Sequence, residues 1–220
     1  GAWTVRALTN LGHTEEARDY VHRFLQDRWE EDTVALQPLY DIEDGTDLRG
    51  ERELHHLRGY RDSRPVRVGN EAADQQQLDV YGELVLSIYQ RLWDVEQVSE
   101  DDWATIEGIV EYVCDHWDER DVGIWELRGE PRHLVHSKVM CWAALDRALE
   151  LAERTGRDVP FERWRECRDE IRAAVLERGF DEELNSFTQS FEGSELDATA
   201  LLIPTTGFLP ANDPRVEGTV

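Results

Sequence analysis

The stretch GIWELRGEPRHLVHSKVMCWAALDRALELAERTG, residues 123–156, joins a polar loop to a long helical pattern. Its second half predicts a helix from about His136 to Arg154. That helix should end before Gly156, because glycine is the favoured residue just past a helix C-terminus. The stretch therefore indicates a helical protein with polar chemistry in the loop that precedes one of its helices.

The loop contains an adjacent tryptophan and glutamate, Trp125 and Glu126. A carboxyl beside an indole is partly desolvated, which disfavours its charged form and raises its pKa, as a general acid near neutral pH requires. The indole also offers a flat apolar face of the kind on which sugar rings stack. Glu126 is therefore the candidate general acid, and a loop glutamate beside a core tryptophan is the plain alternative.

The helical pattern continues along almost the whole chain. Apolar residues recur at helical spacing after Thr14, Asn70 and Ser99, which are all residue types favoured at an N-cap. Ser99 with Asp102 three positions on also predicts a capping box. Further helices are expected over about 160–178 and 196–203, and from Asp213-Pro214 onward. No strand–helix alternation is visible, so successive antiparallel helices predict an all-α fold, an α/α toroid.

A long irregular stretch, from about Gln37 to Gly69, interrupts the helices. Loops of this length are uncommon inside compact domains and are often functional. Its later part carries a cluster of polar and cationic residues, namely Tyr60, Arg61, Arg64 and Arg67. Their planar guanidinium groups suit sugar hydroxyls, and they suit carboxylate partners within the protein equally well.

Three blocks of sequence resemble family 15 of the glycoside hydrolases, the glucoamylase and trehalase family. The first is GYRDSRPVRVGN, residues 59–70, followed by LDVYGE at 78–83. The second is the segment 123–148, and the third is FTQSF at 187–191 with LDA at 196–198 and GFLP at 207–210. The three blocks span nearly the whole chain.

The resemblance implies an (α/α)6 barrel, inverting hydrolysis of α-glucosidic bonds, and two catalytic glutamates. The glutamate that follows a tryptophan corresponds to Glu126, and the second glutamate finds no match here. A Trp-x-Arg-Asp element of the family is expected just before Gly1. We therefore expect residues 1–220 to be an incomplete toroid. They would form part of one catalytic domain whose N-terminal and C-terminal portions are missing, and this fragment alone would be inactive.

The substrate implied by the resemblance is an α-glucoside or an α-glucan oligosaccharide, as for a glucan 1,4-α-glucosidase. The residues expected to bind it are Trp125, Arg128, His133, Tyr60, Arg61, Arg64 and Arg67, gathered with Glu126 in one cavity. Fungal glucoamylases carry an acidic residue at the position of Leu127 and an aspartate at that of Gly123. These departures leave a trehalase of the same family open. A non-catalytic helical-repeat binding module is the alternative from another class.

The chain is strongly acidic, with 48 acidic and 24 basic residues and a formal net charge of −24. Nucleic acids and anionic membranes would be repelled, so neither is an expected partner. Lys138 is the only lysine. An acidic, lysine-poor composition is typical of proteins from a high-salt, haloarchaeal cytoplasm, where ions screen the repulsion. We accordingly expect a cytoplasmic protein.

Cys114, Cys141 and Cys167 form no C-x-x-C pair and each falls in a helical pattern, which predicts buried, reduced thiols. His55-His56 lacks nearby cysteine or histidine partners, so no zinc is expected, nor any other metal or cofactor. No apolar run approaches the length of about 18 residues that a membrane span needs. The oligomeric state does not follow from the sequence.

Overall fold

The computed structural model describes residues 2–26, 36, 38–39, 50–91, 98–127 and 129–220. The α-helices are α1 (Ala2–Asn10), α2 (Thr14–Gln26), α3 (Asp79–Arg91), α4 (Glu100–His116), α5 (Val135–Thr155), α6 (Phe161–Arg178), α7 (Ile203–Thr206) and α8 (Pro214–Thr219). Two small antiparallel sheets pair β1 (Arg52–Glu53) with β2 (Arg67–Val68), and β3 (Phe180–Asp181) with β4 (Ser186–Phe187). Helices dominate, so the predicted all-α class is confirmed.

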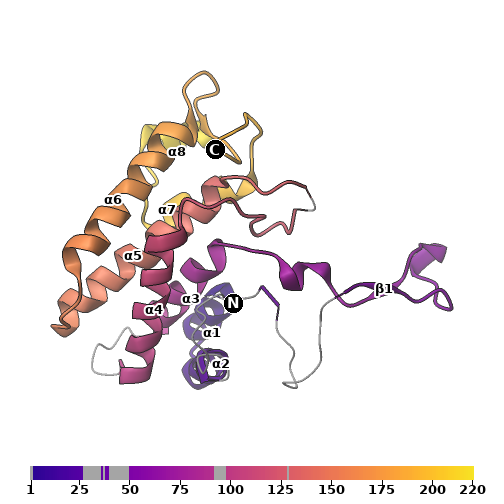
Figure 1. Cartoon of the computed structure of the whole chain (residues 1–220), viewed down its shortest axis with the longest axis horizontal. Helices are drawn as coiled ribbons and strands as arrows, with labels where there is room; N and C mark the ends of the chain where they lie inside the picture. The colour runs from indigo at the N-terminus through magenta and orange to yellow at the C-terminus, as the bar shows by residue number, and fades with distance from the viewer. Residues whose placement is uncertain (1, 27–35, 37, 40–49, 92–97, 128) are drawn as a thin grey trace.

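Successive helices alternate between two layers. Helices α1, α3 and α5 pack on one another in that order and form the inner layer. Helices α2, α4 and α6 form the outer layer and pack against the inner one (Figure 1). This alternation of inner and outer helices is the arrangement of an α/α toroid. Helix α5 contacts α3 within the inner layer and α4 and α6 in the outer layer, which explains why most of α5 is buried.

Helices α3 and α5 approach each other closely at Gly82. A Cβ atom at this position would collide with the backbone carbonyl of Met140. Only glycine lets the two helix backbones come this near, so Gly82 sets the spacing of the inner layer.

Polar contacts join the outer helices α4 and α6. Arg163 Nε donates to Glu111 at 3.0 Å, and Trp164 Nε1 donates to the same carboxylate at 2.6 Å. One turn further along, the thiols of Cys114 and Cys167 share a hydrogen bond, which lowers the pKa of Cys114. All three cysteines are free, and Cys141 and Cys167 are buried, but Cys114 is only half-buried. The prediction of three buried thiols was therefore wrong at Cys114.

Most helix ends lie where the sequence predicts them. The capping box at Ser99 is present, with Asp102 N donating to Ser99 Oγ at 3.0 Å and Ser99 N donating to Asp102 Oδ2 at 3.2 Å. Gly156 ends α5 in the left-handed conformation at φ +68°. Asp213 caps α8 by accepting from Arg215 N at 3.0 Å.

At two positions where the sequence predicts the start of a helix, the structure has a short 3-10 helix. Asn70 does act as a cap, accepting from Ala72 N at 3.0 Å, but it caps a short 3-10 helix, Glu71–Asp74. The α-helix begins later, at Asp79. The segment expected as a helix over 196–203 is a 3-10 helix, Ala198–Leu202, that leads into α7.

Candidate active site

The candidate acid loop, residues 122–131, is closed at its base. Asp121 and Arg132 exchange two backbone hydrogen bonds of 2.9 Å, so the segment between them forms a pinched loop. Gly123 is buried inside it at φ +62°, where an added Cβ would meet the Leu134 side chain. An aspartate at this position would strain the backbone, because a residue with a side chain rarely adopts this φ.

The base of the loop is fixed to two inner helices through the buried carboxylate of Asp121. It accepts hydrogen bonds from Leu78 N, beside the start of α3, at 3.0 Å and from Ser137 Oγ, in the first turn of α5, at 2.7 Å. Burial raises the pKa of Asp121 and these hydrogen bonds oppose the rise. The loop thus stands at the N-terminal ends of α3 and α5.

The tip of the loop presents Trp125 and Glu126. Trp125 is 56% exposed, yet its Nε1 donates to both carboxylate oxygens of Asp197, at 2.9 and 3.0 Å. Glu126 adopts φ +50°, a left-handed turn, and its backbone N donates to Gly123 O at 3.0 Å. Its side chain is exposed. The predicted desolvation of Glu126 by the indole is therefore wrong for this structure, since the turn exposes the carboxyl while the indole faces Asp197.

Asp197 is a site residue that the sequence analysis did not assign. Besides Trp125, its carboxylate accepts from Thr199 N at 2.8 Å and from Gln189 Nε2 at 3.0 Å. Partial burial alone would raise its pKa, but the hydrogen bonds outweigh burial and lower it. The position of Asp197 just before a helix indicates an N-cap, and Asp197 does cap the 3-10 helix that follows it. Nothing in the sequence signals a contact with a residue 72 positions away.

Of the two predicted binding residues His133 and Arg128, the structure describes only His133. The His133 ring stacks on Phe191 with ring centroids 6.0 Å apart, and its Nε2 lies 3.7 Å from Glu192. Burial and the charge of Lys138 lower the pKa of His133. Its described partners are thus the segment after β4 and Asp118, 4.0 Å away just after α4, rather than Glu126. Arg128 lies outside the described residues.

The cationic cluster lies on a separate hairpin, residues 50–69, which projects from the helical body (Figure 1). Tyr60 at its tip is 81% exposed, and the Arg61 guanidinium lies 5.3 Å from the centre of the Tyr60 ring. Arg64 Nη1 donates to the backbone carbonyl of His55 at 3.2 Å. These contacts stay within the hairpin.

Arg67 follows the same pattern. Its guanidinium lies 3.4 Å from Glu51 and 3.6 Å from Glu53, both on the opposite side of the hairpin. Of the two roles left open for these arginines, internal pairing is therefore the one visible. A cavity shared with the Trp125–Glu126 loop stays a prediction, and the described contacts of Arg64 and Arg67 stay within the hairpin. Its role in substrate binding stays a prediction.

The first turn of α5, next to the acid loop, is unusually polar and buried. Lys138 is 0% exposed, and its Nζ donates to the backbone carbonyl of Glu119. Burial lowers the pKa of Lys138. His136 is 7% exposed and has no hydrogen-bond partner among the described residues. Burial lowers its pKa to about 4, so its imidazole is neutral near pH 7.

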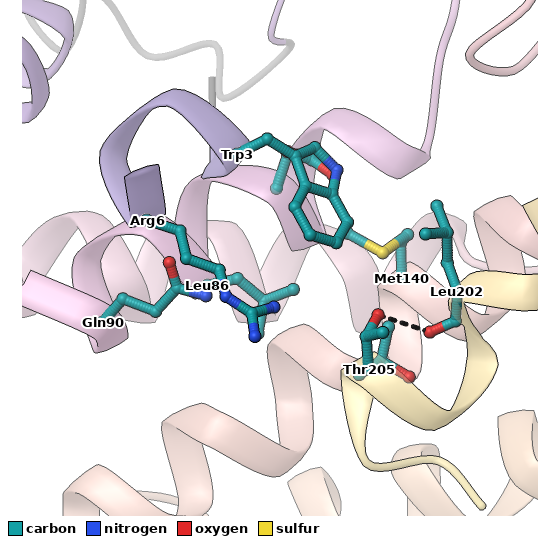
Figure 2. Close-up of a pocket in the computed structure, with 9 residues that line it drawn as sticks. Trp3, Arg6, Leu86, Gln90, Met140, Leu202 and Thr205 are labelled. Atoms are coloured by element: carbon teal, nitrogen blue, oxygen red, sulfur yellow. Dashed lines mark hydrogen bonds between the residues drawn. The ribbon is translucent and has the colours of Figure 1, made fainter. Parts of the chain in front are cut away.

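A small cavity of about 30 Å³ lies elsewhere, lined by residues of α1, α3 and α5. Figure 2 shows the Trp3 indole beside Met140, with Leu202 and Thr205 closing the other side. Neither Trp125 nor Glu126 lines it. No group of side chains suited to a metal ion occurs within the part of the chain that the structure describes. Among the same residues, no helix combines the length and apolarity needed to cross a membrane.

Solved structures share this fold. A glycosidase structure superposes with a TM-score of 0.58 at 18% identity, covering 74% of this chain and 45% of its own. The glucoamylase from Saccharomycopsis fibuligera superposes with a TM-score of 0.53 at 14% identity, covering 64% of this chain and 35% of its own. These similarities establish the glucoamylase-like α/α toroid.

Curated relatives are closer in sequence. A trehalase of Mycobacterium tuberculosis is 44% identical over 97% of this chain, which corresponds to 31% of that protein. A trehalase of Thermoplasma volcanium is 38% identical over 100% of this chain and 34% of its own length. The chain therefore spans about a third of the length of these relatives. Residues 1–220 also match the family described as Glycosyl hydrolases family 15. Since that match covers the whole chain, the chain belongs to family 15 of the glycosyl hydrolases.

Proposed function

We propose that the full-length protein hydrolyses trehalose, with Glu126 as the general acid. The observation that supports trehalose as the substrate is the 44% identity with a trehalase over 97% of this chain. This favours trehalose over the glucan substrate expected first. The similarity to a glucoamylase structure at 14% identity concerns the fold and does not favour glucans.

The proposed reaction begins with the glycosidic oxygen, which needs a proton to leave. Glu126 supplies it from its carboxyl group as the bond from that oxygen to the anomeric carbon breaks. A water molecule attacks the opposite face of the sugar and gives its proton to a second carboxylate, which we do not assign to a residue of this chain. Trp125, next to the acid, offers an exposed indole face against which a glucose ring can lie.

The loop geometry supports this role. The Trp125–Glu126 tip is exposed, while its base is fixed to α3 and α5 through Asp121. An acid must be accessible to the substrate and held in place, and this arrangement provides both. Trp125, Glu126 and Asp121 thus form the proposed acid side of the site.

The test is anomer-resolved NMR of the full-length protein with trehalose and with maltose. Inversion of an α,α-1,1 bond gives equal initial amounts of α-glucose and β-glucose, because only the attacked sugar changes configuration. Retention would give α-glucose alone. We expect equal initial amounts, and a kcat/KM at least about tenfold higher for trehalose than for maltose. A preference for maltose would refute the substrate, α-glucose alone would refute inversion, and no turnover of either sugar would favour the binding module.

A further inference from the structure

Among the described residues of the acid loop, few contacts besides those of Trp125 hold its tip. The tip turns at Glu126 with φ +50°, a conformation that residues other than glycine rarely adopt. Its backbone contacts are local, from Glu126 N to Gly123 O and from Leu127 N to Val122 O. Trp125 is more than half exposed, so apolar burial contributes little to its position. The contact between Trp125 and Asp197 is thus the side-chain tie between the described tip and the rest of the fold.

Asp197 is itself firmly held. Thr199 N and Gln189 Nε2 each donate to its carboxylate, at 2.8 and 3.0 Å. The backbone carbonyl of Gln189 in turn accepts from Val135 N, the first residue of α5, at 3.0 Å. A chain of hydrogen bonds therefore runs from the start of an inner helix through Gln189 and Asp197 to the indole of Trp125.

The hydrogen bond from Trp125 to Asp197 is of a kind that can hold a side chain in one position. A carboxylate has two acceptor oxygens, and the indole N–H lies at nearly equal distances from both, 2.9 and 3.0 Å. The surrounding donors keep the pKa of Asp197 low, so the carboxylate is charged at neutral pH. A hydrogen bond to a charged acceptor is stronger than a neutral one and more directional than apolar contact.

We propose that Asp197 is a positioning residue that holds the Trp125 indole and thereby keeps the adjacent carboxyl of Glu126 at the glycosidic oxygen. This inference rests on the proposed role of Glu126 as the general acid. Proton transfer needs the acid within hydrogen-bond reach of the leaving oxygen, and a displacement of about 1 Å can lower the rate by about 10². Loss of the Asp197 contact frees the neighbouring turn to move.

A cap role alone is the competing explanation, because Asp197 also caps the 3-10 helix that follows it. The two explanations differ in which substrate is affected. Trehalose needs a proton on its leaving oxygen, whereas α-glucosyl fluoride releases fluoride without one. A residue that acts through the acid should therefore matter for trehalose and much less for the fluoride.

The experiment compares kcat for both substrates in Asp197→Ala, Asp197→Asn and Trp125→Phe variants of the full-length protein. For Asp197→Ala we expect kcat on trehalose to fall by about 10–10², with KM nearly unchanged and a much smaller fall on the fluoride. Asparagine keeps one acceptor oxygen for the indole, so Asp197→Asn should recover most of the activity.

Trp125→Phe tests the same contact from the other side, since it removes the indole N–H and leaves the Thr199 cap intact. Adding Asp197→Ala to Trp125→Phe should cause little further loss, because both changes remove one interaction. This double variant keeps the inference testable if Asp197→Ala alone proves unstable. The matched control is Asp213→Ala, which removes the carboxylate that caps α8. It should lower the melting temperature without a difference between the two substrates.

Two outcomes would overturn the positioning role: an unchanged kcat on trehalose, or an equal loss on both substrates. A Glu126→Gln variant separates this failure from failure of the proposed function. If Glu126→Gln keeps normal activity on trehalose, the acid assignment is wrong. If Glu126→Gln loses that activity while Asp197→Ala keeps it, only the role of Asp197 is wrong.

Discussion

The indole nitrogen of Trp125 donates to both carboxylate oxygens of Asp197, although the two residues are 72 positions apart in the chain. The contact links the loop before α5 to the segment before α7. Both segments reach the N-terminal end of α5, because Val135 N donates to Gln189 O and Phe191 N donates to His133 O. The proposed site is thus organised around the start of one inner helix.

The first prediction concerns the acid. In the full-length protein, Glu126→Gln keeps the side-chain shape and removes the transferable proton, so kcat on trehalose should fall by about 10²–10⁴. KM should change little, because the lost interaction belongs mainly to the transition state. Steady-state kinetics measures both. Glu130→Gln, an exposed glutamate of the same loop, is the control and should behave as the parent. A near-normal kcat for Glu126→Gln would remove it as the acid.

The second prediction concerns pH and Asp79. Burial, aided by the charge of Asp121, raises the pKa of Asp79 from 3.8 to about 7. The folded protein therefore binds this proton more tightly than the unfolded chain, and the associated stability is lost as pH rises toward and through about 7. Asp79→Asn carries no charge, so its melting temperature should gain on the parent between about pH 5 and about pH 8.

The control for Asp79 is Asp101→Asn, which changes an exposed carboxylate on α4. Its melting-temperature difference from the parent should not follow the same rise with pH. If the gain of Asp79→Asn is the same at both pH values, Asp79 does not carry this buried charge.

The third prediction concerns the inner layer. Alanine in place of Gly82 would favour the helix by up to about 1 kcal/mol. Its Cβ would, however, collide with the Met140 carbonyl and push α3 from α5. Overpacking of this kind costs about 1–3 kcal/mol, so Gly82→Ala should destabilise the protein in urea unfolding.

The matched control is Gly129→Ala, where an added Cβ meets nothing within 4 Å. Its free energy of unfolding should stay within about 0.5 kcal/mol of the parent value. A stability of Gly82→Ala equal to or above that of the control would show that α3 and α5 do not depend on this close approach.

The fourth prediction concerns salt. The net charge is −24, so acidic side chains within the folded protein repel one another at low ionic strength. Molar KCl shortens the screening length to about 3 Å and weakens this repulsion. The melting temperature should rise steeply with KCl. Because salt also strengthens apolar burial, a neutral protein of similar size is measured alongside. An increase no larger than that of the neutral protein would reject adaptation to high salt.

Local signals determined much of this fold. The apolar spacing in α4, α5 and α6, the capping box at Ser99 and the left-handed Gly156 all depend on residues within one or two turns. Such signals are written in the neighbouring sequence, so these elements were predictable. Asn70 shows the limit, because a cap marks where a helical turn begins without deciding whether a 3-10 or an α-helix follows.

The sequence by itself therefore determined an all-α chain of paired helices and singled out the Trp125–Glu126 loop. Only the tertiary structure decided that the Trp125 indole faces Asp197, that Lys138 is fully buried, and that Arg67 pairs within its own hairpin. The physical reason is distance along the chain. Helical periodicity and caps are short-range, whereas these partners depend on how packed helices orient their connecting loops, which no local pattern encodes.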